Sequence, residues 1–442
     1  MRISQSWQPI SLRYGDNGHL WLANTDLHAL AQDKGTPLYV LDLATLMARC
    51  QAYQQCFNAY PGKVQLVYAS KALSCVGVLQ LMHKLGFAVD VVSGGELLTA
   101  FKAGLPGEKI VFHGNNKSRA ELLDALMAGT GRIVIDSLDE LTRLESLVHD
   151  TGLPAEVLLR VVPGIEAHTH EHIKTGQRDT KFGIPSEQVL EAVRRVLKQP
   201  RIRFCGLHAH VGSQIFDAEP LAQCAEVLLD LAAHIETQTG TWIDDLNIGG
   251  GLGIAYTDSD HPVALEQVAE RLIISIQNKC SQLKKPLPRL MLEPGRSLVA
   301  TAGLTLYSVG TLKEILGVRS IAAVDGGMAD NPRPITYGAK YTVDCVNKAT
   351  EDLTHKYRVV GKFCESGDIL LKEAQLPKLD IGDVLVVYAT GAYNYSMASN
   401  YNRVPRPAMV LVTADQVLDL VARETAEDLL RHDQHLPPDL LK

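Results

Sequence analysis

The sequence predicts an α/β protein that combines a closed (β/α)8 barrel of the TIM type with a second, mostly antiparallel β domain. Three observations predict it. Eight short apolar runs recur between about residues 60 and 300, helix-like segments separate them, and beyond about residue 300 strand-like runs are separated by Gly, Pro and Asp turns. We therefore expect a barrel domain over residues 40–300, and a β domain made of residues 1–39 and 301–442 that ends in a helical tail.

The eight apolar runs are the predicted strands of the barrel. They cover residues 64–70, 87–93, 109–114, 132–136, 156–162, 204–212, 244–250 and 289–295. Strands that read as continuously apolar, and that alternate with helices, indicate a parallel sheet covered on both faces. The segments between them, such as "GGELLTAFKAG", carry apolar residues at helical spacing. Eight such units favour a closed barrel over an open doubly wound sheet.

The remaining strand-like runs predict the β domain. They lie at residues 303–315, 320–327, 356–371, 382–391 and 407–412, between turn residues typical of antiparallel sheets. The opening segment, to about residue 40, also contains strand-like pieces, and we expect it to pack with this domain. The polar tail from about residue 420 has helical spacing and no evident chemistry.

Composition excludes several classes of protein. The 442 residues are 46% apolar and 21% charged, as in an ordinary globular protein, and the formal charge of -7 with no basic tract argues against nucleic-acid and anionic-membrane partners. No run resembles a secretory signal or a membrane span. The eight cysteines are scattered without a C-x-x-C pair, which indicates reduced thiols and a cytoplasmic location.

Reactive residue types gather at the ends of the predicted strands. In (β/α) barrels the chemistry lies at the C-terminal ends of the strands. Those ends carry Lys71, Ser93, His113, Asp136, His210 with Ser213, Gly249 to Gly251, and Glu293 with Arg296. One lysine at a strand end is usually explained by an apolar stem that covers the surface. The series of such residues at successive ends is what predicts a site.

The stretch "NIGGGLG", residues 247–253, follows the seventh strand. Backbone N–H groups at a glycine turn can bind a phosphate, although the stretch is neither a P-loop nor a dinucleotide-binding fingerprint. By itself an ordinary tight turn explains it equally well. Phosphate sites in these barrels commonly use the loops after the seventh and eighth strands, so its position favours a phosphate site.

Two histidine patterns need weighing. His208 and His210 are two residues apart, so on a strand they face the same way. We expect one to stack on a flat cofactor and the other to be structural. The run with His168, His170 and His172 looks more metal-like, but no strand or helix fixes its geometry, and we expect no metal.

The stretch "LEPGR" ends the eighth strand with Glu293 and Arg296. A structural salt bridge is one explanation. The other is that Glu293 holds a proton on a heterocyclic nitrogen while Arg296 meets an anion. A strand-end lysine, a phosphate loop, a stacking histidine and such a carboxylate are together what pyridoxal 5'-phosphate requires.

With these motifs the chain resembles the diaminopimelate decarboxylases, a family of the alanine-racemase-fold class of pyridoxal-phosphate enzymes. The matching motifs run in order from about residue 35 to 415: "YASKA", "DVVSGGEL", "IVFHGNNKS", "HTHEHIKTG", "GLHAHVGSQI", "LNIGGGLGI", "LEPGRSLV", "RPITY", "CESGDIL" and "ATGAYNYSMASNYN". Ornithine and arginine decarboxylases share the pyridoxal motifs, whereas "HGNNKS", "HTHEHI" and the "CESGD" context are more specific to this family.

The resemblance implies a role for each matching residue. The implied catalytic residues are Lys71 as the Schiff-base lysine, His210 stacked on the ring, Glu293 at the pyridinium nitrogen and Cys364 as proton donor. The implied cofactor-binding residues are Lys71, His210, Ser213, Gly249, Gly250, Gly251, Glu293, Pro294, Gly295, Arg296 and Tyr393. The implied substrate-binding residues are Arg296, Arg333, Tyr337, Glu365 and Tyr393.

The reaction that the resemblance implies is decarboxylation of meso-2,6-diaminopimelate to L-lysine and CO2, the last step of lysine biosynthesis. It also implies a homodimer in which Cys364 and Glu365 enter the partner subunit's site. One departure is visible, because a histidine that often follows the tyrosine of "RPITY" by four places is Tyr341 here.

Three alternatives remain. A decarboxylase of ornithine, arginine or carboxynorspermidine would want acidic residues where Arg296 and Arg333 suit a second carboxylate. An amino-acid racemase usually has an arginine at the ring nitrogen, where this chain has Glu293. A small pyridoxal-phosphate carrier would lack the C-terminal β domain.

Overall fold

The computed structural model describes residues 5–164 and 180–441. The chain divides into two compact units: a barrel unit, Leu46–Ala300, and a β unit made of Met1–Thr45 and Thr301–Lys442. The run that contains His168, His170 and His172 lies outside the described residues.

The barrel unit contains a closed barrel of eight parallel strands, and each predicted strand is present. Their bounds are β5 Val64–Ala69, β6 Ala88–Val91, β7 Ile110–Phe112, β8 Arg132–Ile135, β9 Ala155–Arg160, β10 Ile202–His208, β11 Asp245–Asn247 and β12 Arg289–Leu292. Around the barrel the strands follow one another in chain order, and β12 closes it on β5 through pairs such as Leu292 with Leu66. The predicted fold class is confirmed.

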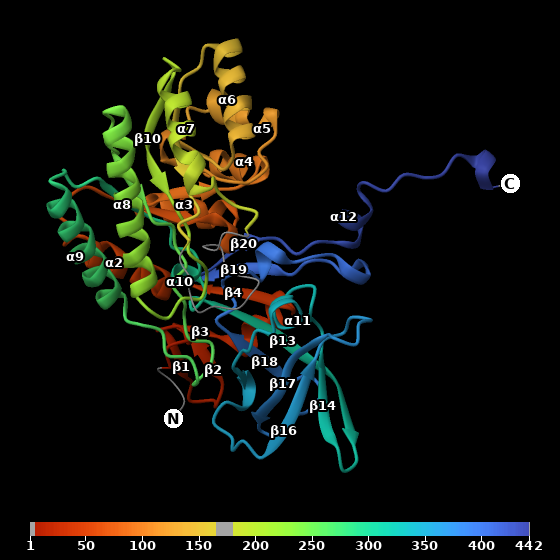
Figure 1. Cartoon of the computed structure of the whole chain (residues 1–442). Helices are drawn as coiled ribbons and strands as arrows, with labels where there is room; N and C mark the ends of the chain where they lie inside the picture. Colours follow the sequence, from red (N-terminus) through yellow and green to blue (C-terminus); the bar gives the residue numbers. More distant parts are fainter. Residues whose placement is uncertain (1–4, 165–179, 442) are drawn as a thin grey trace. The chain divides into compact units, whose positions relative to one another are not determined.

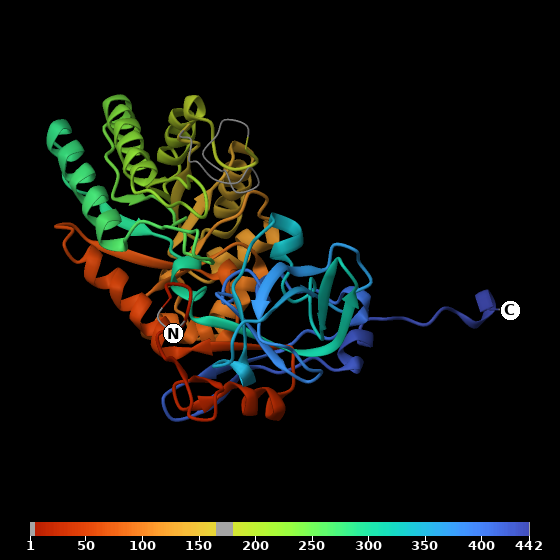
Figure 2. The same cartoon turned by 90° about the horizontal axis from the view of Figure 1, so that it is seen from below.

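Helices cover the outside of these strands (Figures 1 and 2). They are α2 Leu43–Phe57, α3 Val76–Lys84, α4 Gly94–Lys102, α5 Arg119–Met127, α6 Leu138–Thr151, α7 Ser186–Leu197, α8 Glu219–Thr239 and α9 Leu265–Leu283. The short α10, Arg296–Val299, follows the last strand, β12. One buried residue from each of seven strands joins a single hydrophobic cluster: Val67, Ala88, Val111, Val134, Leu158, Cys205 and Met291. Apolar runs buried on both faces explain why these segments form a parallel sheet rather than an alternating one.

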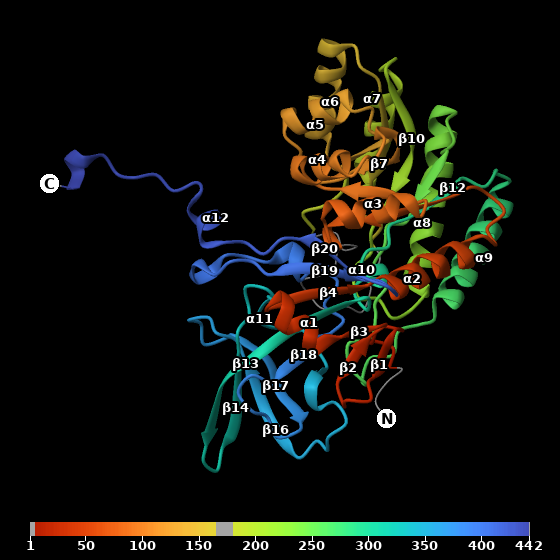
Figure 3. The same cartoon turned by 180° about the vertical axis from the view of Figure 1, so that it is seen from behind.

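The β unit contains two sheets. A small one joins β1 Leu12–Tyr14, β2 Leu20–Leu22 and β3 Thr25–Asp26. The larger one has the order β17-β16-β14-β13-β4-β19-β20, and β18 pairs with β13 and β15 (Figure 3). Its strands are β4 Leu38–Asp42, β13 Gly303–Ile315, β14 Arg319–Val324, β15 Val343–Cys345, β16 His355–Val360, β17 Ile369–Leu376, β18 Val384–Tyr388, β19 Ala408–Val412 and β20 Val417–Val421. The helices of this unit are α1 Leu27–Lys34, α11 Arg333–Tyr337 and α12 Ala426–Leu430.

The larger sheet is mostly antiparallel, with two parallel pairs. β14 pairs with β16, and β4 pairs with β19, each in parallel. Parallel neighbours need a long connection, which the chain provides between the members of each pair. All five residues of β4 are buried, and β13 lies antiparallel on its other side.

None of the helices within residues 5–164 and 180–441 has the combination of length and apolar character needed to cross a membrane.

Candidate active site

Lys71 lies in a single turn of 3-10 helix, Ser70–Ala72, directly after β5, and its side chain is exposed. The preceding Ala69 donates its N–H to the carbonyl of Pro294 over 3.1 Å. A Cβ on Gly295 would come within 3.0 Å of the Ala69 side chain. The loop after β12 is therefore packed against the turn that carries the lysine.

Glu293 is the centre of a buried polar cluster at the C-terminal ends of the strands. Its Oε1 accepts hydrogen bonds from Asn247 Nδ2 at 2.7 Å and from His113 Nε2 at 2.8 Å. Its Oε2 lies 3.3 Å from His208 Nε2. The rings of His113 and His208 meet edge to face, with centroids 4.8 Å apart. The cluster thus joins the ends of β7, β10, β11 and β12 at one carboxylate.

The pKa values of the two buried carboxyl groups in this cluster are shifted in opposite directions. Burial acts to raise the pKa of Glu293, but the His113 and His208 side chains outweigh it and hold that pKa well below its usual range. Asp90, 4.0 Å from His113, has its pKa raised by burial and by the charge of Glu293, against an opposing effect of His113. Burial lowers the pKa of His208 to about 4, so this imidazole is neutral at pH 7.

These three side chains are also close enough to ligate a metal ion. One ligand atom from each of His113, His208 and Glu293 lies within 4.8 Å of the others. The hydrogen bond between His113 and the carboxylate needs no metal.

His210 is half-buried and touches the glycine loop. Its Nδ1 accepts the N–H of Gly250 at 3.3 Å. Burial, and then the nearby Lys71 and Arg160, lower the pKa of His210 well below its usual value. The imidazole is therefore neutral at pH 7.

The glycine loop approaches its neighbours too closely for any side chain. Gly249 has a φ of 67°, and a Cβ there would lie 2.8 Å from the carbonyl of Ala209. A Cβ on Gly250 would lie 2.0 Å from the carbonyl of Glu293. The loop backbone is thus packed between the ends of β10 and β12, as a loop that binds an anion through its main chain requires.

Arg296 and Ser213 lie side by side next to this loop. Arg296 is buried and donates through Nη2 to Ser213 Oγ at 3.1 Å and through Nη1 to the Tyr256 hydroxyl at 2.6 Å. Gly251 accepts the N–H of Ile215 through its carbonyl at 3.0 Å, which holds the loops after β10 and β11 together. A cation, a hydroxyl and a glycine backbone therefore meet, which is a donor set suited to a phosphate.

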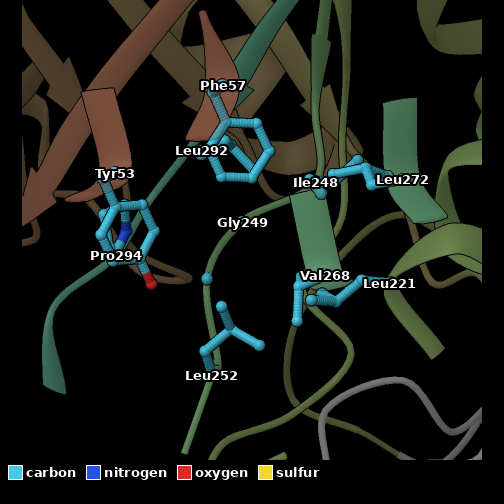
Figure 4. Close-up of a pocket in the computed structure, with 11 residues that line it drawn as sticks. Tyr53, Phe57, Leu221, Ile248, Gly249, Leu252, Val268, Leu272, Leu292 and Pro294 are labelled. Carbon is cyan, nitrogen blue, oxygen red and sulfur yellow. The ribbon is translucent and has the colours of Figure 1, made fainter. Parts of the chain in front are cut away.

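An apolar pocket supports the glycine loop. Gly249 and Gly250 form part of its wall, together with Tyr53 and Phe57 of α2 and Leu272 of α9 (Figure 4). The lining offers no charged group, so the pocket is a packing feature of the loop rather than an anion site.

The β unit carries the other predicted residues. Arg333, the first residue of α11, is buried, and its Nη1 donates to the Tyr341 hydroxyl at 2.7 Å. Tyr341 is the position at which the chain departs from the family pattern, and here it holds the predicted arginine. Tyr337 is half-buried at the end of the same helix. Tyr393 has a φ of 62°, a left-handed conformation that an aromatic residue adopts rarely and mostly at functional sites.

Cys364 and Glu365 lie on an exposed loop between β16 and β17. The N–H of Cys364 is donated to Asn402 Oδ1 at 2.8 Å, so the backbone of the loop is held in place while the thiol is exposed. The other seven cysteines are buried or half-buried, and all eight are free thiols.

Within the barrel unit, the structure brings together the predicted Lys71, His210, Ser213, Gly249, Gly250, Gly251, Glu293, Pro294, Gly295 and Arg296 at the C-terminal ends of the strands. The predicted Arg333, Tyr337, Cys364, Glu365 and Tyr393 belong to the β unit.

Sequence reasoning placed His113 among the reactive strand-end residues and expected one of His208 and His210 to be structural, but it gave no role to Asp90 or to the side chain of Asn247. His113 is at a strand end and Asn247 opens the glycine motif, so position offered a signal for both. The contacts of these residues with Glu293 leave no pattern in the sequence.

The barrel residues fit pyridoxal 5'-phosphate. Arg296, Ser213 and the glycine loop suit its phosphate, neutral His210 suits the face of its ring, and ionised Glu293 suits a protonated ring nitrogen. Lys71 supplies the amine that its aldehyde needs.

Comparison with known proteins gives consistent matches. Residues 43–300 match the family described as pyridoxal-dependent decarboxylase, pyridoxal binding domain. The chain is 46% identical over 439 residues to the diaminopimelate decarboxylase of Synechocystis sp., covering 97% of this chain and 93% of that protein. It is 45% identical over 423 residues to the diaminopimelate decarboxylase of Bacillus subtilis, covering 95% and 96%. The crystal structure of the M. jannaschii diaminopimelate decarboxylase in complex with L-lysine has a TM-score of 0.90 at 33% identity, covering 98% of this chain and 99% of that chain.

Proposed function

Because the chain belongs to the family of pyridoxal-dependent decarboxylases, we propose that it converts meso-2,6-diaminopimelate to L-lysine and CO2, as the last step of lysine biosynthesis. The observation that carries this proposal is similarity over nearly the full length of both chains to proteins named diaminopimelate decarboxylase. The site at the strand ends, with its ionised Glu293, supports the proposal on chemical grounds.

We propose pyridoxal 5'-phosphate as the cofactor, which when bound supplies an electron sink for the bond that breaks. Lys71 would bind the cofactor through its amine, and the substrate amine would then take the place of the Lys71 amine. Glu293, fixed by Asn247 and His113, would hold a proton on the ring nitrogen, since its own pKa is too low for it to take the proton away. His210 would cover one face of the ring and exclude water from it.

Cys364 is the proposed proton donor. The substrate's carboxylate leaves as CO2, and the electron pair of the broken C–C bond takes up the proton of the Cys364 thiol, which is restored from solvent. The exposed position of this thiol supports a role outside its own β unit.

For the substrate we propose Arg296, Arg333, Tyr337, Glu365 and Tyr393 as its binding residues. The two arginines suit the second carboxylate that distinguishes diaminopimelate from ornithine, and Glu365 suits the distal ammonium group.

We also propose a homodimer in which Cys364 and Glu365 serve the partner subunit's site. Their exposure on a loop with a well-held backbone supports this. The eight free thiols support a reducing compartment, and we propose the cytoplasm.

The test is CO2 release by the purified protein with pyridoxal phosphate. Four substrates are compared: meso-diaminopimelate, ornithine, arginine and carboxynorspermidine. Release from diaminopimelate alone, with lysine as the product, is the expected result. Release from another of these amines, with none from diaminopimelate, would keep the Lys71 chemistry and overturn the assignment of Arg296 and Arg333.

A further inference from the structure

Asp368 lies in the turn before β17 and is 4% exposed. Its Oδ1 accepts the N–H of Met328 at 2.8 Å, and its Oδ2 accepts the N–H of Phe363 at 2.9 Å. Met328 belongs to residues 325–332, here called the Arg333 loop because it leads into α11. Phe363 belongs to residues 361–368, here called the Cys364 loop. One carboxylate therefore joins the two loops that lead to proposed active-site residues.

The carboxylate of Asp368 is packed closely against the backbone of two glycines. A Cβ on Gly361 would lie 2.1 Å from Oδ2, and a Cβ on Gly327 would lie 2.5 Å from Oδ1. Both glycines are needed for the backbone of each loop to approach the carboxylate. Lys362 also donates its N–H to the carbonyl of Gly326 at 3.0 Å, so the two loops touch directly as well.

The Cys364 loop is held on its far side too. Asn402 accepts the N–H of Cys364 at 2.8 Å, and the Tyr401 hydroxyl lies 3.4 Å from the carbonyl of Cys364. Phe363, immediately before, is buried. The backbone at Cys364 is thus held between Asn402 and the carboxylate of Asp368, while the thiol of Cys364 is exposed.

We propose that Asp368 is a positioning residue for the reaction: by tying the Cys364 loop to the Arg333 loop, it holds in place both Cys364 and Glu365, which serve the partner subunit's site, and Arg333, which serves the site of its own subunit. This inference rests on the proposed function, in which Cys364 delivers the proton and Arg333 binds the substrate.

The first variant is Asp368→Asn. An amide keeps the size of the side chain but places an NH2 group against one of the two backbone N–H groups, so one loop loses its acceptor. We expect kcat for CO2 release from diaminopimelate to fall roughly tenfold, the cost of one hydrogen bond to a charged group, and KM to rise. The absorbance of the bound cofactor should not change, because all its proposed ligands except Tyr393 belong to the barrel unit.

The second variant is Gly361→Ala, whose added Cβ would lie 2.1 Å from Oδ2 of the same carboxylate. It should reproduce the fall in kcat and the rise in KM, although Asp368 itself is intact.

Asp383→Asn is the matched control. Asp383 is also 4% exposed, belongs to the same unit, and accepts hydrogen bonds from Lys348 at 2.7 Å and Asn347 at 2.8 Å. Its loss should lower the melting temperature while kcat and KM stay at wild-type values, so a general loss of stability is separated from a loss of positioning.

Hydrogen–deuterium exchange of the backbone gives a readout that does not depend on activity. In Asp368→Asn, the peptide that contains the Met328 amide or the one that contains the Phe363 amide should exchange faster, whereas in Asp383→Asn neither should. Faster exchange with wild-type kcat and KM would overturn the proposal, as would an equal kinetic defect in Asp383→Asn. Wild-type protein that releases no CO2 from diaminopimelate would instead overturn the proposed function, so the two failures are distinguishable.

Discussion

Glu293 is kept ionised by its neighbours, because burial alone would drive it toward the neutral acid. His113→Phe removes the 2.8 Å hydrogen bond to Oε1 and keeps a ring of similar shape. The pKa of Glu293 should rise, and the pH below which kcat/KM is lost should move up by roughly one to two units, the equivalent of one hydrogen bond to a charged group. The measurement is CO2 release from pH 8 down to the lowest pH at which both proteins stay folded, because the pKa of Glu293 lies well below its usual range.

The control for that variant is His149→Phe, on the exposed face of α6. Its pH profile should match that of the wild type. An unchanged acid limb in His113→Phe would contradict the role given to His113.

At the residue scale, the sequence predicts which groups lie at strand ends but not which of them touch. Glu293 and Lys71 could be placed because the C-terminal ends of parallel strands converge. The bond between His113 and Glu293 joins the third and eighth strands, and depends on register and barrel closure, which hydrophobic periodicity does not contain. Similarly, "CESGD" includes Asp368, but nothing in the motif indicates that its carboxylate reaches Met328.

At the scale of elements, a buried ion pair ties α6 to the ends of β7 and β8. Lys117 Nζ lies 2.8 Å from Glu140 Oε1, with both side chains 1% exposed, and it also donates to the carbonyls of Gly114 and Val134. Lys117→Met leaves the Glu140 charge buried without its partner and should lower the free energy of unfolding by about 3–5 kcal/mol.

The double variant Lys117→Met with Glu140→Leu should cost less than Lys117→Met alone, since no charge is then left in the interior. Urea unfolding of the wild type, the two single variants and the double variant measures the difference. A double variant at least as unstable as the sum of the two single variants would contradict the coupling.

The secondary-structure elements were easier to predict from the sequence than the contacts between side chains. All eight barrel strands were identified because each is a continuous apolar run between helical segments. The β unit was predicted as mostly antiparallel, but the parallel pairs β4–β19 and β14–β16 were not, because partners far apart in sequence leave no local pattern.

At the scale of the whole molecule, the proposed shared sites make a prediction about mixed dimers. Lys71→Ala and Cys364→Ala proteins should each be inactive. After dissociation and reassociation together they should recover about a quarter of wild-type activity, because half of the dimers are mixed and each mixed dimer has one intact site.

The measurement is CO2 release by the reassociated mixture and by mixed dimers isolated with two different affinity tags, which should have about half of wild-type activity. Lys71→Ala reassociated with itself is the control and should remain inactive. Inactive mixed dimers would contradict sharing of the sites while leaving the assignment of Lys71 intact.

The position of β4 in its sheet has a consequence for how the chain is made. Leu38–Asp42 are synthesised early, yet β13 begins at Gly303 and β19 ends at Val412. At the usual rates of translation, this buried strand waits roughly 20 to 70 seconds on the ribosome for its last neighbour, while the contiguous barrel unit is completed. Loss of β19, by an early stop or a stalled ribosome, would leave one edge of β4 open to strands of other nascent chains.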